Sequence, residues 1–176
     1  TAVFSFDVSS LTDPAAIVHA TLNLTTSGMG GGNGGSSVRE IYAYRLNQDF
    51  VEDEADWEDS ADGTNWSGGD DVGAASNSEI TQYSLSAKSR LESYCDVGSR
   101  VSTQPDFNIT ELVRDAINKR SGTLLLWIGI PISDTVTTSG HVTVHSPNAI
   151  SASNRPKIDL VVADRKVWQG DNLPDQ

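Results

Sequence analysis

Residues 17–25 read IVHATLNLT, and this short stretch carries the clearest signal of fold class in the chain. Apolar and polar side chains alternate along it, which is typical of a half-buried β-strand. Leu22 and Leu24 share the inward side with Val18, while mostly polar residues, beginning with Ile17, occupy the other side. The alternation predicts a strand with one face in a hydrophobic core.

Similar short strands are predicted on both sides of this one, separated by turns rich in Gly, Pro, Asn and Ser. They cover residues 2–8, 38–46, 80–85, 123–132, 140–146 and 157–163. The nearly continuous apolar run 123–132 indicates a central strand buried on both faces. Residues 28–35 are almost all glycine and are expected to form a flexible connection. Many strands and one helix predict an all-β sandwich with jelly-roll character.

The one predicted α-helix spans about residues 108–120. Its apolar residues follow the spacing of a single buried stripe, at Ile109, Leu112, Val113, Ala116 and Ile117. Asn108 and Glu111 have the spacing of a capping pair at its start, and Gly122 is expected to end it.

Residues 49–71 are strongly acidic, contain two tryptophans and fit neither helical nor strand periodicity, which predicts a long structured loop. Exposed aromatic faces bind sugars by stacking, so Trp57 and Trp66 are candidate ligand-binding residues, with Tyr42 and Tyr44 behind them. The alternative for Trp57 is that it plugs one end of the sandwich, with its indole N–H bonded to a loop carbonyl. For Trp66 both interpretations stay open.

The same loop offers carboxylate oxygens, which are the ligands that Ca²⁺ prefers. The candidate metal ligands are Asp53, Asp56, Asp59, Asp70 and Asp71, although their spacing does not match an EF-hand. The alternative is a solvated acidic loop without a bound ion.

The net charge of −12 argues against two classes of partner. Nucleic acids and anionic membrane surfaces both require a positive protein face, and no apolar run is long enough to insert into a membrane. The sequence pairs no two carboxylates as a glycosidase would and has no Gly-x-Ser-x-Gly elbow. We therefore expect a chain that is not an enzyme.

The ordered series of segments resembles the DNRLRE-type domain, a jelly-roll module related to carbohydrate-binding modules. The matching segments are residues 4–11, 20–24, 41–46, 54–57, 109–117, 122–126 and 152–158. Together they cover most of residues 1–163. The resemblance implies an extracellular, non-enzymatic β-sandwich of the kind found on secreted polysaccharide-acting proteins, surface proteins and virion components.

Two functions follow as expectations for a single domain over residues 1–163 with a polar tail at 164–176. The first is an extracellular module that binds carbohydrate or mediates surface adhesion. The second is a structural decoration protein of a virion (phage capsid or tail) or another extracellular assembly. The family has a strand before the segment at residues 4–11 that this chain lacks, so a neighbouring subunit, including a second copy, is expected to complete the sheet.

Overall fold

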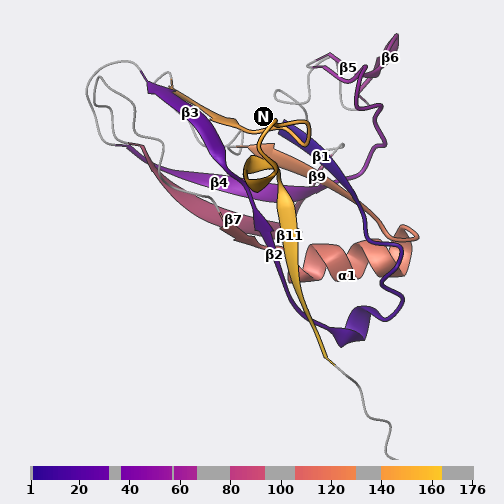
Figure 1. The fold of residues 1–176 in the computed structure, drawn as a ribbon. Coiled ribbons are helices and arrows are strands. Elements are labelled where there is room, and N and C mark those ends of the chain that lie inside the picture. Colours follow the sequence, from indigo (N-terminus) through magenta and orange to yellow (C-terminus); the bar gives the residue numbers. More distant parts are fainter. Residues whose placement is uncertain are drawn as a thin grey trace, which may run out of the picture.

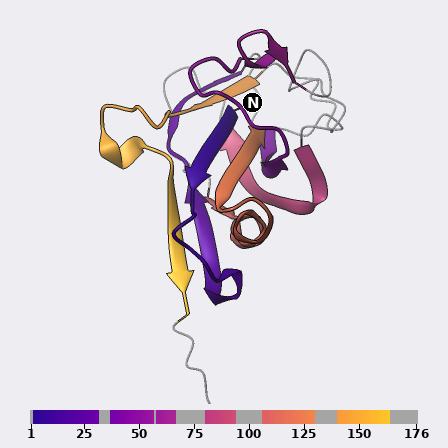
Figure 2. The same ribbon diagram turned by 90° about the vertical axis from the view of Figure 1, so that its right-hand side faces the viewer.

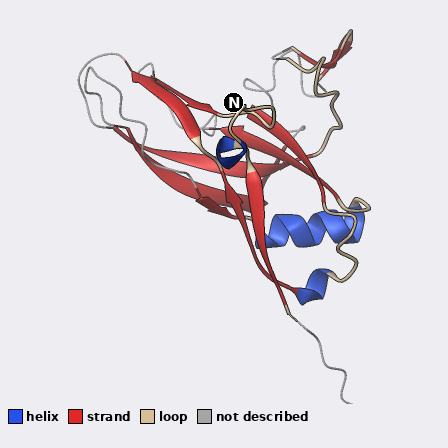
Figure 3. Ribbon diagram, in the orientation of Figure 1, coloured by secondary structure: helices blue, strands red, loops and turns tan. Residues whose placement is uncertain are grey.

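The computed structural model describes residues 2–31, 37–56, 58–66, 80–93, 106–129 and 140–163 (Figure 1). Within these ranges the chain consists mainly of antiparallel strands with one α-helix, which confirms the predicted all-β class (Figure 3). The strands are β1 (Ala2–Asp7), β2 (Ile17–Asn23), β3 (Thr26–Gly31), β4 (Ser37–Leu46), β5 (Asp59–Ala61), β6 (Thr64–Asn65), β7 (Ile80–Ser93), β8 (Asp106–Asn108), β9 (Thr123–Gly129), β10 (Gly140–Val144) and β11 (Lys157–Val162). The helices are α1 (Thr110–Lys119) and the 3₁₀ turns η1 (Pro14–Ala16) and η2 (Ala152–Asn154).

The first layer is a four-stranded sheet in the order β1-β9-β4-β7. In its register, Phe4 faces Leu126 and Ala43 faces Ile128. Every residue of β9 after Thr123 is buried, because one face of the strand meets the main core and the other face lies under a loop. The prediction of a central strand buried on both faces is confirmed for residues 124–129.

The second layer is a three-stranded sheet in the order β11-β2-β8, and β3 pairs separately with β10. β3 continues in space from β2, as Figure 1 shows. Residues 28–31 therefore belong to a strand, and the prediction of a flexible connection is wrong for this part. The ladder with β10 depends on backbone groups, which glycine supplies as well as any residue.

The main core lies between the two layers. Its buried side chains come from β1, β2, β4, β8, β9 and α1; the largest of them are Phe4, Ile17, Leu22, Leu24, Phe107, Ile109, Leu124 and Leu126. α1 packs against β2 and β9, one strand from each layer, and Figure 2 shows it end-on beneath β9. Jelly-roll connectivity remains a prediction, and the tail at 164–176 lies outside the described residues.

The start of β2 departs from the predicted alternation. Ile17 is 1% exposed and Val18 is 54% exposed, so these two residues have exchanged the faces expected for them. The pairing of β2 with β11 shifts register between Val161 and Val162, opposite this point. A local bulge of this kind turns a side chain to the other face, and the sequence alternation gives no sign of it.

α1 begins two residues later than predicted, because Asn108 still belongs to β8 and pairs with Thr21. Asn108 Oδ1 nevertheless accepts hydrogen bonds from the Thr110 backbone N–H (3.2 Å) and hydroxyl (2.6 Å), so it supports the helix start. Glu111 pairs with Arg114 in the next turn. Gly122 follows the helix with a φ of 83°. None of the described helices is long and apolar enough to cross a bilayer.

Candidate functional site

The outer face of the four-stranded sheet carries a cluster of aromatic side chains. Val3, Trp127 and Tyr44 lie side by side on β1, β9 and β4, because the register places both Val3 and Tyr44 opposite Trp127. The ring centroids of Tyr44 and Trp127 are 5.4 Å apart, and those of Tyr42 and Tyr44 are 5.5 Å apart with nearly parallel planes. Tyr44 and Trp127 are buried, while Tyr42 is partly exposed.

Residues 47–56 and 58–66, called the loop 47–66 below, fold over this aromatic cluster. The backbone N–H of Val51 donates to Ser60 O (2.9 Å), and Ser60 Oγ donates to Thr64 O (3.0 Å). β5 and β6 form a small antiparallel hairpin at the far end, where Gly63 takes a positive φ of 69° at the turn. The prediction of a loop without strands is thus wrong at residues 59–65, since this hairpin is too short for its periodicity to be recognised.

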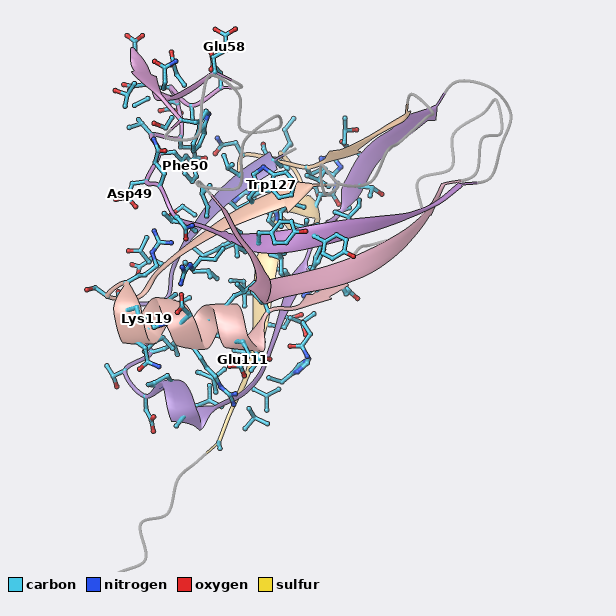
Figure 4. All side chains as sticks on the ribbon, turned by 180° about the vertical axis from the view of Figure 1, so that it is seen from behind. Asp49, Phe50, Glu58, Glu111, Lys119 and Trp127 are labelled. Atoms are coloured by element: carbon cyan, nitrogen blue, oxygen red, sulfur yellow. The ribbon has the colours of Figure 1, made fainter. Side chains whose placement is uncertain are left out.

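Figure 4 shows Phe50 on the side of this loop that faces the sheet and Glu58 near its tip. Phe50 and Ala55 pack against the aromatic cluster, while Glu58 is exposed. The loop thus places apolar groups toward the sheet and carboxylates toward solvent, which explains why its sequence mixes the two kinds of residue.

Trp66 closes the loop onto the sheet. Its side chain is 2% exposed and packs in the aromatic cluster with Tyr44, Leu46, Leu125 and Trp127. Its indole N–H donates to the carbonyl oxygen of Asp56 at 3.1 Å. Trp66 therefore fulfils the plugging role that sequence reasoning considered for Trp57, and its faces are not available for stacking on a sugar.

The four predicted ligand-binding aromatics are not gathered on one exposed surface. Trp66 and Tyr44 are buried, Tyr42 is partly exposed, and Trp57 lies outside the described residues. Within the described part of this group, Tyr42 is the side chain that keeps contact with solvent. Trp66 and Tyr44 are shielded from solvent because they pack in the aromatic cluster, where neighbouring rings exclude water from their shared faces.

The predicted metal ligands are also spread out. Asp56 Oδ1 accepts the backbone N–H groups of Glu58 and Asp59, both at 2.8 Å, and thereby holds a turn. The N–H of Asp59, followed by that of Glu58, lowers the pKa of the Asp56 carboxyl. Asp53 is exposed, and Asp70 and Asp71 lie outside the described residues.

Among the residues that the structure describes, no three His, Cys, Asp or Glu side chains come together in a way that could hold a metal ion. The calcium site stays a prediction, since two of its five proposed ligands are among the residues not described.

A buried ion pair that sequence reasoning missed joins α1 to β4. Asp115 is 7% exposed, and its two carboxylate oxygens contact Arg45 Nη1 (2.9 Å) and Lys119 Nζ (3.0 Å). Burial raises the pKa of Asp115, but the hydrogen bonds and positive charges of Arg45 and Lys119 outweigh burial, so the pKa lies below its ordinary value. The ion pair between Asp115 and Lys119 could have been predicted, because the two residues are four positions apart on one helix.

A second surface is formed by the edge strand β11. Three of its apolar residues are exposed, namely Leu160 (36%), Val161 (54%) and Val162 (50%), and Val18 (54%) lies on the neighbouring strand β2. Within the described residues β11 pairs with β2 on one side and with no strand on the other. Sequence reasoning identified this strand but made no prediction about the exposure of its apolar residues.

Comparisons with family models, with curated proteins and with solved structures found no match. The resemblance to the DNRLRE-type domain therefore stays a prediction.

Proposed function

We propose that the chain is a non-catalytic, extracellular β-sandwich module that serves as a structural subunit of a larger assembly, such as a virion decoration protein. The observation that carries this proposal is the exposed apolar surface along the edge of β11 that pairs with no strand among the described residues. Leu160 and Val162 are exposed next to each other on one face of β11, and neighbouring exposed apolar groups mark contact sites. We call these two side chains the β11 patch.

The chemistry of the strand supports the same conclusion. An edge strand offers free backbone N–H and C=O groups, and natural proteins usually block such edges with proline, inward charges or a covering segment. β11 has no proline between Lys157 and Val162, and its charged residues, Lys157 and Asp159, lie at its start. As far as the structure describes the chain, the second half of the edge is therefore open to another strand.

The placement of the aromatic residues also supports a structural role. Trp66 and Tyr44 fasten the loop 47–66 to the sheet, so their large apolar surfaces contribute to stability rather than to an exposed ligand face. Each such side chain contributes roughly 2–3 kcal/mol when it is buried. The packing of Trp66 and Tyr44 in the aromatic cluster therefore explains why the sequence contains these two residues.

Native mass spectrometry of the protein, isolated under mild conditions from its own source, tests this function. We expect a complex of fixed stoichiometry that contains several copies of this chain, other protein chains, or both. Recovery of a free monomer that binds a defined glycan would contradict the proposal.

Binding of carbohydrate is the second candidate, and the partly exposed ring of Tyr42 at the rim of the aromatic cluster favours it. A glycan array with the purified chain, with and without calcium, separates the two functions. If this candidate holds, binding is lost in Tyr42→Ala, and dependence on calcium places an ion in the acidic loop. If the chain binds carbohydrate, we also expect its strands to have the jelly-roll connectivity of known carbohydrate-binding modules.

A further inference from the structure

We propose that the partner of β11 is a second copy of this chain. Two β11 strands pair antiparallel about a two-fold axis at Leu160 and join two β11-β2-β8 sheets into one continuous six-stranded sheet. This inference rests on the proposed function and names the partner of the β11 patch. Figure 2 shows that β11 stands at the outer side of the molecule, with β2 as its neighbour.

The symmetry of such a pair limits its register. A two-fold axis perpendicular to the sheet leaves each face of the strand on the same side of the sheet in both copies. Because side chains alternate between faces, a residue can lie opposite only a residue of the second copy whose number differs from its own by an even number. Pairing about Asp159 places two carboxylates directly opposite each other, which is unfavourable. Pairing about Leu160 places Ile158 opposite Val162 of the second copy and uses the whole strand.

The side chains of β11 complement themselves in this register. Ile158, Leu160 and Val162 lie on one face and form a continuous apolar row with the same residues of the second copy. Ile158 already packs against the main core, whereas Leu160 and Val162 are exposed in the single chain. The added strand therefore extends the core face past the point where it ends in the monomer.

The local charge also permits self-association. The whole chain carries a net charge of −12, which opposes contact between two copies. β11 itself is neutral, because Lys157 and Asp159 are its charged residues and they pair with each other at 3.2 Å. At physiological ionic strength the remaining acidic groups are screened beyond about 8 Å. A neutral edge on an acidic molecule is where two copies can approach most closely.

Paired charge variants at Val161 test the register. In the proposed pair Val161 lies opposite Asp159 of the second copy, with side chains about 5 Å apart. Val161→Asp creates two carboxylate contacts across the interface, and Val161→Lys creates two ion pairs at the same places. We expect wild-type protein to approach twice the monomer mass as its concentration rises to ~100 μM in sedimentation equilibrium at physiological salt.

Val161→Asp is expected to weaken the association about tenfold or more, and Val161→Lys to leave it within about threefold of wild type. Both substitutions lie on an exposed position, and circular dichroism with thermal unfolding confirms that each variant is folded. Equal weakening by the two variants, or stronger association of Val161→Asp, overturns the register. Wild-type protein that stays monomeric overturns the self-pairing, while a native complex with other protein chains keeps the proposed function.

Discussion

At the scale of single residues, Asp115 links the helix to the sheet. It sits in the buried face of α1, yet it is fully paired, because Arg45 reaches it from β4 and Lys119 from the next helical turn. A buried carboxylate is tolerated only when its charge is compensated in this way. Arg120 adds a second link, since its guanidinium donates to the carbonyl oxygen of Leu46 at the end of β4.

Replacing Asp115 with Asn is expected to reduce the free energy of unfolding by about 2 kcal/mol at pH 7, because Arg45 and Lys119 lose their counter-charge. The folded-state pKa of Asp115 lies below the unfolded value, so this contribution is fully present above about pH 5 and is lost as the pH falls through the folded-state pKa. Urea unfolding of wild type and Asp115→Asn at pH 7 and at pH 3 measures the difference in their free energies of unfolding.

The difference between wild type and Asp115→Asn should therefore shrink as the solution is acidified. Glu111→Gln is the matched control, because Glu111 pairs with Arg114 on the exposed side of the same helix. An exposed pair contributes less than about 1 kcal/mol. A difference between wild type and Asp115→Asn that stays constant down to pH 3 would count against this account.

Gly122 fills a place that no other residue fits. Its φ is 83°, and an added Cβ would lie 2.3 Å from the Cα of Ser9, at the point where Val8 N–H donates to Gly122 O. Gly122→Ala is expected to cost about 3 kcal/mol or more of unfolding free energy, because backbone would have to move.

Gly63→Ala is the control for Gly122→Ala. Gly63 has a similar φ of 69°, but nothing lies within 4 Å of an added Cβ. Only the conformational cost of about 1 kcal/mol is expected there. Thermal unfolding of the two variants measures how much stability each one loses. Equal losses of stability would show that the close approach of Gly122 to Ser9 is unimportant.

At the scale of elements, the loop 47–66 depends on one tryptophan. Trp66 supplies both the apolar ring that fills the aromatic cluster and the N–H that bonds to Asp56 O. Trp127, in the same cluster, has an indole N–H without a partner among the described residues. The two tryptophans therefore differ in what their N–H groups do for the loop.

Trp66→Phe is expected to speed hydrogen exchange of the Val51 and Asp56 amides about fivefold, because losing one hydrogen bond removes about 1 kcal/mol of local stability. Trp127→Phe, the matched control, should change these two amides less. The Ala163 amide follows β11 and donates to Ala16 O in η1, so it should keep its rate in both variants. Equal acceleration by both variants would show that the Trp66 hydrogen bond does not hold the loop.

The strands could be predicted from the sequence, because alternation is a local pattern. Residues 17–23 of the first stretch and 123–129 of the apolar run form strands, with the expected burial apart from the bulge at Ile17 and Val18. The prediction of a flexible connection is wrong at residues 28–31, because a strand ladder uses backbone groups, which composition does not reveal. The short hairpin of β5 and β6 gave too few residues to establish a period.

The candidate site was less predictable. Whether Trp66 faces solvent or the sheet depends on how residues 47–66 fold back over β4 and β9, and this is a tertiary contact between segments far apart in sequence. The exposure of Leu160 and Val162 depends on β11 being an edge strand, which a single strand sequence cannot show. The pairing of Arg45 with Asp115 spans 70 positions and has no local signature.

At the scale of the whole molecule, the described surface has two contrasting regions. The loop 47–66 presents carboxylates to solvent, while β11 presents a neutral apolar edge. In the function proposed above, the acidic region keeps copies of the molecule apart, and the β11 edge is the place where the partner binds.

Hydrogen exchange along β11 as a function of protein concentration tests this account most directly. In the single chain, alternate amides of Lys157–Val162 point away from β2 and have no strand partner in the described part of the chain, so they should exchange quickly in dilute protein. We predict that these amides slow as the concentration rises and that Val161→Asp abolishes the slowing. Exchange at the same rate at every concentration, in wild type and variant alike, would contradict the account.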